Sequence, residues 1–155
     1  MNAVNRRAQF PLRRVALAAV AGGLAAAAAN TGAFLLLHGL GVEFSIQSSP
    51  TTPAAPMPVP SFAVASFLPA LIAGGLLVLL GRFTTRARTA FVVIACAFAL
   101  LSLAGPATVG GASAATRVAL MFMHIVAAVI ISGTLMRSEV RTEPREVAAA
   151  VGERA

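Results

Sequence analysis

Residues 62–105 have the sequence FAVASFLPALIAGGLLVLLGRFTTRARTAFVVIACAFALLSLAG, in which two long apolar runs flank a short loop that contains three arginines. The runs, 62–81 and 89–105, contain no charged side chain. Each is close to the ~20 residues that a helix needs to cross ~30 Å of hydrocarbon at 1.5 Å per residue. A helix also pairs its backbone amides within its own segment, as lipid requires. The stretch therefore predicts two antiparallel membrane-spanning helices that lie side by side.

Two further apolar runs of the same kind occur at 15–40 and 118–136. The whole chain of 155 residues is 58% hydrophobic and only 11% charged, with a mean hydropathy of +0.86. Soluble domains are about a quarter charged, so this composition excludes an ordinary cytosolic enzyme. We therefore expect an all-α, membrane-spanning four-helix bundle over residues 15–136.

The 12 basic residues are all Arg, and they are unevenly distributed between the apolar runs. Four precede the first run in the basic segment 1–14, three lie in the loop 82–88, and four lie in the tail 137–155. With the N-terminus inside, only Arg117 is outside, which is a strong positive-inside signal. We expect a multi-pass plasma-membrane protein with both termini cytoplasmic. This segregation, and the absence of Tyr and Trp for base stacking, argue against nucleic acid as a partner.

The first apolar run has two interpretations. It is either a retained helix or a signal peptide cleaved after the alanine-rich stretch that ends at Asn30. The run continues through Leu37, well beyond the ~7–15 apolar residues of a typical signal peptide, which favours a retained helix.

The segment 41–61 is the only long connection, and we expect it outside. It begins with the alternating stretch VEFSIQ (42–47), which has a strand period, and continues with five of the nine prolines. Proline at this density excludes a helix. The alternatives are a short strand or hairpin over the outer mouth of the bundle and a flexible solvated loop.

Several sequence stretches together resemble one known family. They are GRFTTRART (81–89), SLAGP (102–106) and GASAATRVALMFMHIVAA (111–128). In these stretches the chain is similar to the domain of unknown function 6069 family, whose members are small four-helix bacterial integral membrane proteins. The resemblance covers the second to fourth helices best and implies the same four-helix fold. It implies no activity, cofactor or catalytic residue.

Each predicted helix, or its outer end, carries a polar residue in the outer half of the membrane. Counted at 1.5 Å per residue, Asn30 and His124 lie at one depth, and Ser66 and Ser102 lie somewhat further out. Arg117 lies two turns from His124 on the same helix face. Polar groups in lipid turn inward to find partners, so we expect these five side chains to face one another. They form either an outward-opening polar pocket or a set of interhelical hydrogen bonds in a closed bundle.

Catalytic patterns are scarce in this sequence. It has no Asp, no acidic residue in any predicted helix, no phosphate-binding loop and no metal-spaced cluster. We therefore predict no cofactor and no metal, and we favour a protein that is not an enzyme. Small residues recur every four positions from Ala18 to Asn30, a pattern that allows close helix packing or self-association.

Three functions remain open. The favoured one is an interaction or scaffold subunit that binds another membrane protein or a second copy of itself within the lipid bilayer. The alternative is a bundle that binds or transports a small molecule or lipid in the polar pocket. The weaker alternative is a quinone-linked oxidoreductase subunit.

Overall fold

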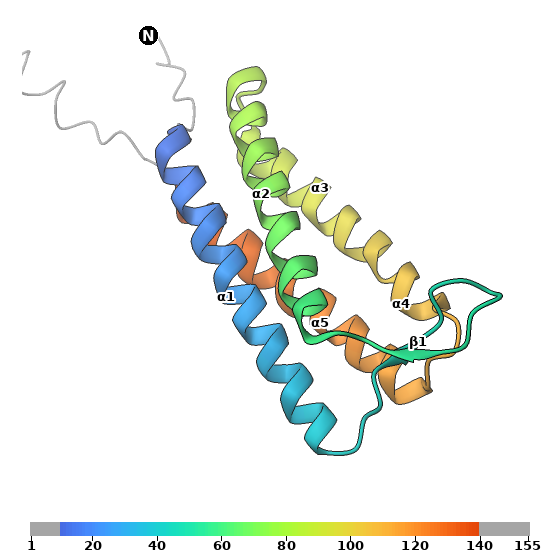
Figure 1. The fold of residues 1–155 in the computed structure, drawn as a ribbon. Coiled ribbons are helices and arrows are strands. Elements are labelled where there is room, and N and C mark those ends of the chain that lie inside the picture. Colours follow the sequence, from blue (N-terminus) through green and yellow to red (C-terminus); the bar gives the residue numbers. More distant parts are fainter. Residues whose placement is uncertain (1–9, 140–155) are drawn as a thin grey trace, which may run out of the picture.

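The computed structural model describes residues 10–139, so the predictions for the first nine residues and for 140–155 lie outside it. The described chain is all-α, apart from one small strand pairing, and its helices run up and down beside one another (Figure 1). Four helical segments are long and apolar enough to cross a membrane, with the two consecutive helices α3 and α4 forming one of them. The helices are α1 (Leu12–Gly39), α2 (Val59–Phe83), α3 (Ala87–Ser102), α4 (Ala104–Thr108) and α5 (Ala114–Met136).

The predicted four-helix fold is confirmed, and the helix bounds differ from the prediction by a few residues. α1 begins three residues earlier than predicted, α2 is longer at both ends, and α5 begins at Ala114 rather than at residue 118. The early start of α5 has a local cause, because the Ser113 hydroxyl oxygen accepts a hydrogen bond from the Thr116 N–H at 3.1 Å. This is an N-cap, which satisfies one of the free amides of the first turn.

The third spanning segment is not one straight helix. The α-helix stops at Ser102, Leu103 is a turn residue, and α4 continues from Ala104. Pro106 explains the break, since it has no N–H to donate to the Ser102 carbonyl and its ring would clash with that carbonyl in a continuous helix. Within α4, Pro106 lies in the first turn, where a missing N–H costs little.

The bundle is held together mainly by the packing of α1 against α2 and α5. Side chains from these three helices and the start of α3 form the main buried cluster. Glycines let the helices approach closely. A Cβ built on Gly74 of α2 would lie 2.8 Å from the Cβ of Ala19, and one built on Gly22 would clash with the Thr134 hydroxyl. The small-residue face of α1 is thus used inside the chain, and Ala26 and Asn30 on the same face are buried.

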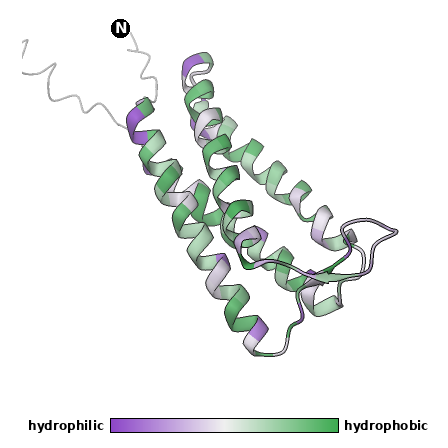
Figure 2. Ribbon diagram, in the orientation of Figure 1, coloured by the Kyte–Doolittle hydropathy of each residue, from purple (hydrophilic) through white to green (hydrophobic). Residues whose placement is uncertain are grey.

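The outer surface of the bundle is apolar. Large hydrophobic side chains are exposed along every spanning helix, for example Leu24, Leu79 and Val129. Figure 2 shows hydrophobic colouring along most of each helix, with the strongly hydrophilic positions mainly near the helix ends. This distribution is what a lipid-facing surface requires.

The segment between α1 and α2 folds back on one end of the bundle, which we call the hairpin end. It contains β1 (Ser45–Ile46) and β2 (Ala55–Pro56), which pair antiparallel. Of the two alternatives for this segment, the structure contains the hairpin. One backbone hydrogen bond connects it to the turn before α5, in which the Gln47 N–H donates to the Gly110 carbonyl at 2.9 Å.

A cluster of three phenylalanines anchors this hairpin. Phe44, just before β1, is 3% exposed and packs against both Phe34 of α1 and Phe62 of α2. The ring centroids lie 4.8 Å apart for Phe34 and Phe44, and 4.4 Å apart for Phe34 and Phe62. The Thr116 hydroxyl adds a hydrogen bond to the Glu43 carbonyl at 2.6 Å.

Candidate functional site

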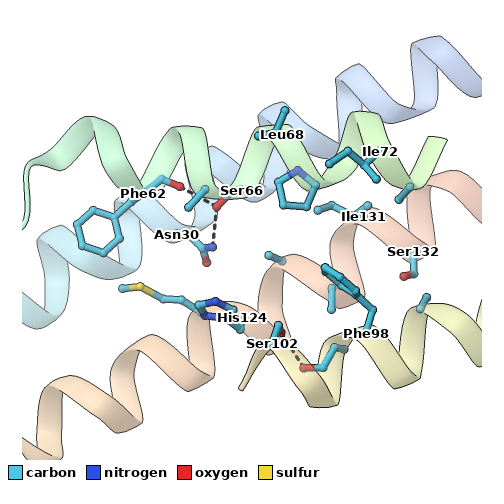
Figure 3. A pocket seen from close by; sticks show the side chains of 18 of the residues that line it. Asn30, Phe62, Ser66, Leu68, Ile72, Phe98, Ser102, His124, Ile131 and Ser132 are labelled. Carbon is cyan, nitrogen blue, oxygen red and sulfur yellow. Dashed lines mark hydrogen bonds between the residues drawn. The ribbon is translucent and has the colours of Figure 1, made fainter. Parts of the chain in front are cut away.

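A cavity of about 530 Å³ lies between α2, α3 and α5, and Asn30 reaches it from α1. This volume is in the range of roughly 300–1,000 Å³ that small-molecule pockets occupy. The walls are almost entirely apolar, and no Arg, Lys, Asp or Glu lines them. Figure 3 shows Asn30, His124 and Phe98 directed into the space between the helices.

The cavity exists because α3 diverges from its neighbours. Near the start of α3, Phe91 is 1% exposed and packs into the main cluster. Further along the same face, Ile94 is 41% exposed and Phe98 is 65% exposed, although both line the cavity. The inward face of α3 thus loses contact with the bundle toward the hairpin end.

Alanines widen the space. Positions that would otherwise be filled by large side chains carry a methyl group on all three walls, so the helices cannot close the gap. These alanines are Ala65 and Ala73 of α2, Ala95 and Ala99 of α3, and Ala127 and Ala128 of α5.

The cavity opens sideways between α2 and α3. Leu68 and Ile72 of α2 line the cavity although they are 56% and 66% exposed. Phe98 of α3, on the opposite side of the opening, also lines the cavity and is exposed. These residues lie within the spanning segments. In a membrane the opening therefore faces lipid chains.

Four of the five residues singled out from the sequence line this one cavity, each from a different helix. They are Asn30, Ser66, Ser102 and His124. In Figure 3 Asn30 and His124 extend toward the same part of the cavity from α1 and α5.

Arg117 is the exception, and the expectation that it faces the other four is corrected. It does not line the cavity, and its guanidinium donates to the Ala107 carbonyl after α3 at 3.5 Å. Because α3 breaks before Pro106, α4 brings this carbonyl to the start of α5. The Nε of Arg117 is buried without a partner in the described chain.

Asn30 is buried, with 6% of its surface exposed, and among the polar lining residues only Ser66 is less exposed. Its amide nitrogen donates to the Ser66 hydroxyl oxygen at 2.8 Å, and the Ser66 hydroxyl donates to the Phe62 carbonyl at 2.8 Å. Since the single hydroxyl proton of Ser66 is used on Phe62, its oxygen can only accept, which assigns the nitrogen of Asn30 to this contact. An interhelical bond of this kind contributes about 0.6–2 kcal/mol in lipid.

The other amide atom of Asn30 has no partner. Its Oδ1 is buried and accepts no hydrogen bond from the described residues. Figure 3 shows this oxygen turned away from Ser66, on the side where His124 lies. A buried acceptor left unpaired costs about 1–3 kcal/mol.

His124 lies next to a backbone acceptor. Its Nδ1 is 2.8 Å from the Leu120 carbonyl, one turn earlier in α5. A carbonyl only accepts, so Nδ1 donates in this contact, and in the singly protonated imidazole with this tautomer Nε2 is an acceptor. Ser102 similarly donates its hydroxyl proton to the Ala99 carbonyl at 2.7 Å.

Sequence reasoning missed the importance of Pro69. It lies inside α2 and lines the cavity, and it has no N–H to donate to the Ala65 carbonyl. The signal was visible as the only proline within that apolar run. Ser61 and Ser132, near the two ends of the cavity, also line it and were not predicted.

Among residues 10–139, no group of three or more His, Cys, Asp or Glu side chains is arranged to hold a metal ion. His38, the other histidine, is exposed and stacks on Phe34 with ring centroids 5.6 Å apart. Cys96 is exposed on α3 and does not line the cavity.

Comparison with known proteins places the chain in a family without assigning a function. A family model described as a family of unknown function, DUF6069, matches residues 10–141. No curated protein and no solved structure matches the chain. Since the match covers most of the sequence, the chain belongs to the DUF6069 family.

Proposed function

We propose that this protein binds an uncharged, largely apolar small molecule of lipid-like character in the cavity between α2, α3 and α5. The observation that carries the proposal is the cavity itself, with about 530 Å³ of space, apolar walls and a few polar groups at one level. Apolar pockets with a small number of convergent polar groups are typical of small-molecule sites.

The lateral opening indicates where the ligand comes from. Its lips, formed by Ile72 of α2 and Phe98 of α3, are exposed apolar side chains in the spanning segments. A molecule dissolved in the bilayer reaches the cavity without crossing water. A charged ligand finds no counter-ion among the lining residues, and an unpaired charge inside the membrane is expensive.

An interaction or scaffold subunit is the alternative proposal. The small residues that recur from Ala18 to Asn30 on one face of α1 allow either close helix packing or self-association. In the structure Gly22 and Ala26 on that face pack inside the chain, so a scaffold function needs another surface. For this reason we place ligand binding first.

We propose further that both termini are cytoplasmic and that the hairpin end faces outward. The support is electrostatic. In the described chain the bundle end opposite the hairpin carries six arginines, and the hairpin end carries Arg117 alone. The six are Arg13, Arg14, Arg82, Arg86, Arg88 and Arg137. This asymmetry follows the positive-inside pattern.

A matched pair of variants on α3 tests ligand binding. Ala99→Trp places an indole in the cavity, whereas Ala97→Trp places the same group on the exposed face, because Ala97 does not line the cavity. Each purified variant is analysed by native mass spectrometry for small molecules that remain bound after mild detergent extraction. We expect wild type and Ala97→Trp to retain bound lipid-like molecules, and Ala99→Trp to lose them at least about tenfold, since the ring fills their space.

Equal retention by both tryptophan variants, or no bound molecule in wild type after incubation with membrane lipids, would rule out the cavity as the ligand site. A protein that co-purifies in stoichiometric amount with wild type and both variants, without a bound small molecule, would favour the scaffold function.

A further inference from the structure

The polar groups at the centre of the cavity have already used most of their donors on the protein. The Ser66 hydroxyl donates to the Phe62 carbonyl, the Ser102 hydroxyl donates to the Ala99 carbonyl, and the Nδ1–H of His124 points to the Leu120 carbonyl. These acceptors are backbone carbonyls one turn earlier in the same helix. Each bond stays within a single helix, so a ligand does not need to break it.

What remains at this level is mostly acceptor capacity. The Oδ1 of Asn30 is buried and has no partner in the described chain, and the Nε2 of His124 has no described hydrogen bond. The oxygen of Ser102 keeps its lone pairs. The carbonyl of Ala65 receives no helical N–H, because residue 69 is a proline. Among Asn30, Ser66, Ser102 and His124 the only donor left is the second N–H of Asn30, while the hydroxyls of Ser61 and Ser132, which can also donate, lie toward the two ends of the cavity.

From these donors and acceptors we infer that the cavity selects an uncharged amphiphile whose polar end is a hydroxyl group, such as a long-chain alcohol. The inference rests on the proposed ligand-binding function and names its ligand class. The hydroxyl donates to the Oδ1 of Asn30, which pairs the one buried side-chain acceptor of the cavity that lacks a partner. The oxygen of the same hydroxyl can accept a hydrogen bond from the remaining N–H of Asn30. Alternatively, the ligand hydroxyl can donate its proton to the Nε2 of His124. The apolar chain lies along the alanine-lined walls toward the opening between α2 and α3.

The same inventory disfavours other membrane ligands. Ketones, esters and the carbonyls of a quinone only accept hydrogen bonds, so they leave Oδ1 of Asn30 unpaired and place a second acceptor beside it. A carboxylate or a phosphate adds a charge with no basic partner among the lining residues. A site with unpaired buried polar groups rejects analogues that lack the matching group.

Photolabelling with competition tests the inference on the full chain reconstituted in phosphatidylcholine nanodiscs. The probe is a long-chain alcohol that carries a diazirine in its chain, and labelled peptides are identified by mass spectrometry. The competitors are dodecanol and dodecyl methyl ether, which have the same chain, but in the ether a methyl group replaces the hydroxyl proton. In wild type we expect label on α3 or α5 residues that line the cavity. Dodecanol should block it at about five- to tenfold lower concentration than the ether, as expected for one donated hydrogen bond to a buried acceptor.

Two variants locate the preference. Asn30→Leu should reduce the alcohol-to-ether ratio to about one, because it removes Oδ1 while keeping the side-chain size. The control Thr134→Val removes a hydroxyl in the spanning part of α5 that bonds only to its own helix and does not line the cavity, so its ratio should equal that of wild type. Should Asn30→Leu fail to fold, His124→Phe keeps a ring at position 124 and should lower the ratio.

The outcomes separate this inference from the proposed function. Equal competition by alcohol and ether in wild type would overturn the hydroxyl selection and leave ligand binding standing. A preference that persists in each folded variant would also overturn it, since the selecting group would lie elsewhere. Absence of label in the cavity would overturn the proposed function itself.

Discussion

From the contact between α1 and α2 we predict that alanine substitutions at two adjacent glycines of α2 differ in their effect on stability. A Cβ on Gly74 would lie 2.8 Å from the Cβ of Ala19, whereas a Cβ on Gly75 meets nothing within 4 Å. Carbon atoms in contact rest at about 3.5–4.0 Å, so Gly74→Ala forces the two helices about 1 Å apart locally. The Ala19 methyl cannot move aside, because it is fixed to the backbone of α1.

Overpacking of this kind costs about 1–3 kcal/mol of the free energy of unfolding. A glycine-to-alanine exchange inside a helix also returns about 0.5–1 kcal/mol of helix propensity, but that gain is common to both variants. The difference between Gly74→Ala and Gly75→Ala is therefore about 1–3 kcal/mol. At about 2–4 °C per kcal/mol for a chain of this size, Gly74→Ala should melt about 2–12 °C below Gly75→Ala.

The assay has to suit the composition. The chain has no Trp and no Tyr, so intrinsic fluorescence gives little signal. We propose to heat detergent-purified protein and to measure the monodisperse fraction by size-exclusion chromatography. Equal melting temperatures for the two variants, or a higher one for Gly74→Ala, would refute the close packing of α1 on α2 as described.

Two further predictions concern the hairpin end and the topology. Phe44→Ala should lower the free energy of unfolding by about 3–5 kcal/mol, because it removes a buried aromatic ring, whereas Phe122→Ala at a 55% exposed position should change it little. Thermal melts of both variants test this, and equal melting temperatures would mean that the hairpin does not pack on the bundle. A reporter fused after Ala155 should be cytoplasmic and an epitope inserted at Thr52 should be accessible from outside, because the arginines gather at the other end of the bundle; an external signal from the C-terminal reporter would contradict this topology.

The sequence by itself determined the fold class of this protein. Four apolar runs without charged residues specify four spanning helices, because the cost of unpaired amides and charges in lipid depends only on local composition. The same local cost predicted that Asn30, Ser66, Ser102 and His124 turn away from lipid, and all four line one cavity. The loss of one helical hydrogen bond at Pro106 is also a local property, but only the structure shows that it interrupts the helix at Leu103.

Only the tertiary structure decided that a cavity exists at all. α3 packs at Phe91 and diverges beyond it, and no periodicity in the sequence encodes the angle between two helices. The partner of each polar group was equally non-local. Asn30 pairs with Ser66, 36 residues away, while Arg117 contacts the Ala107 carbonyl, which the break before Pro106 brings within reach. Hydrogen bonds depend on ångström-scale placement of elements far apart in the chain, whereas membrane insertion depends on the average polarity of a segment.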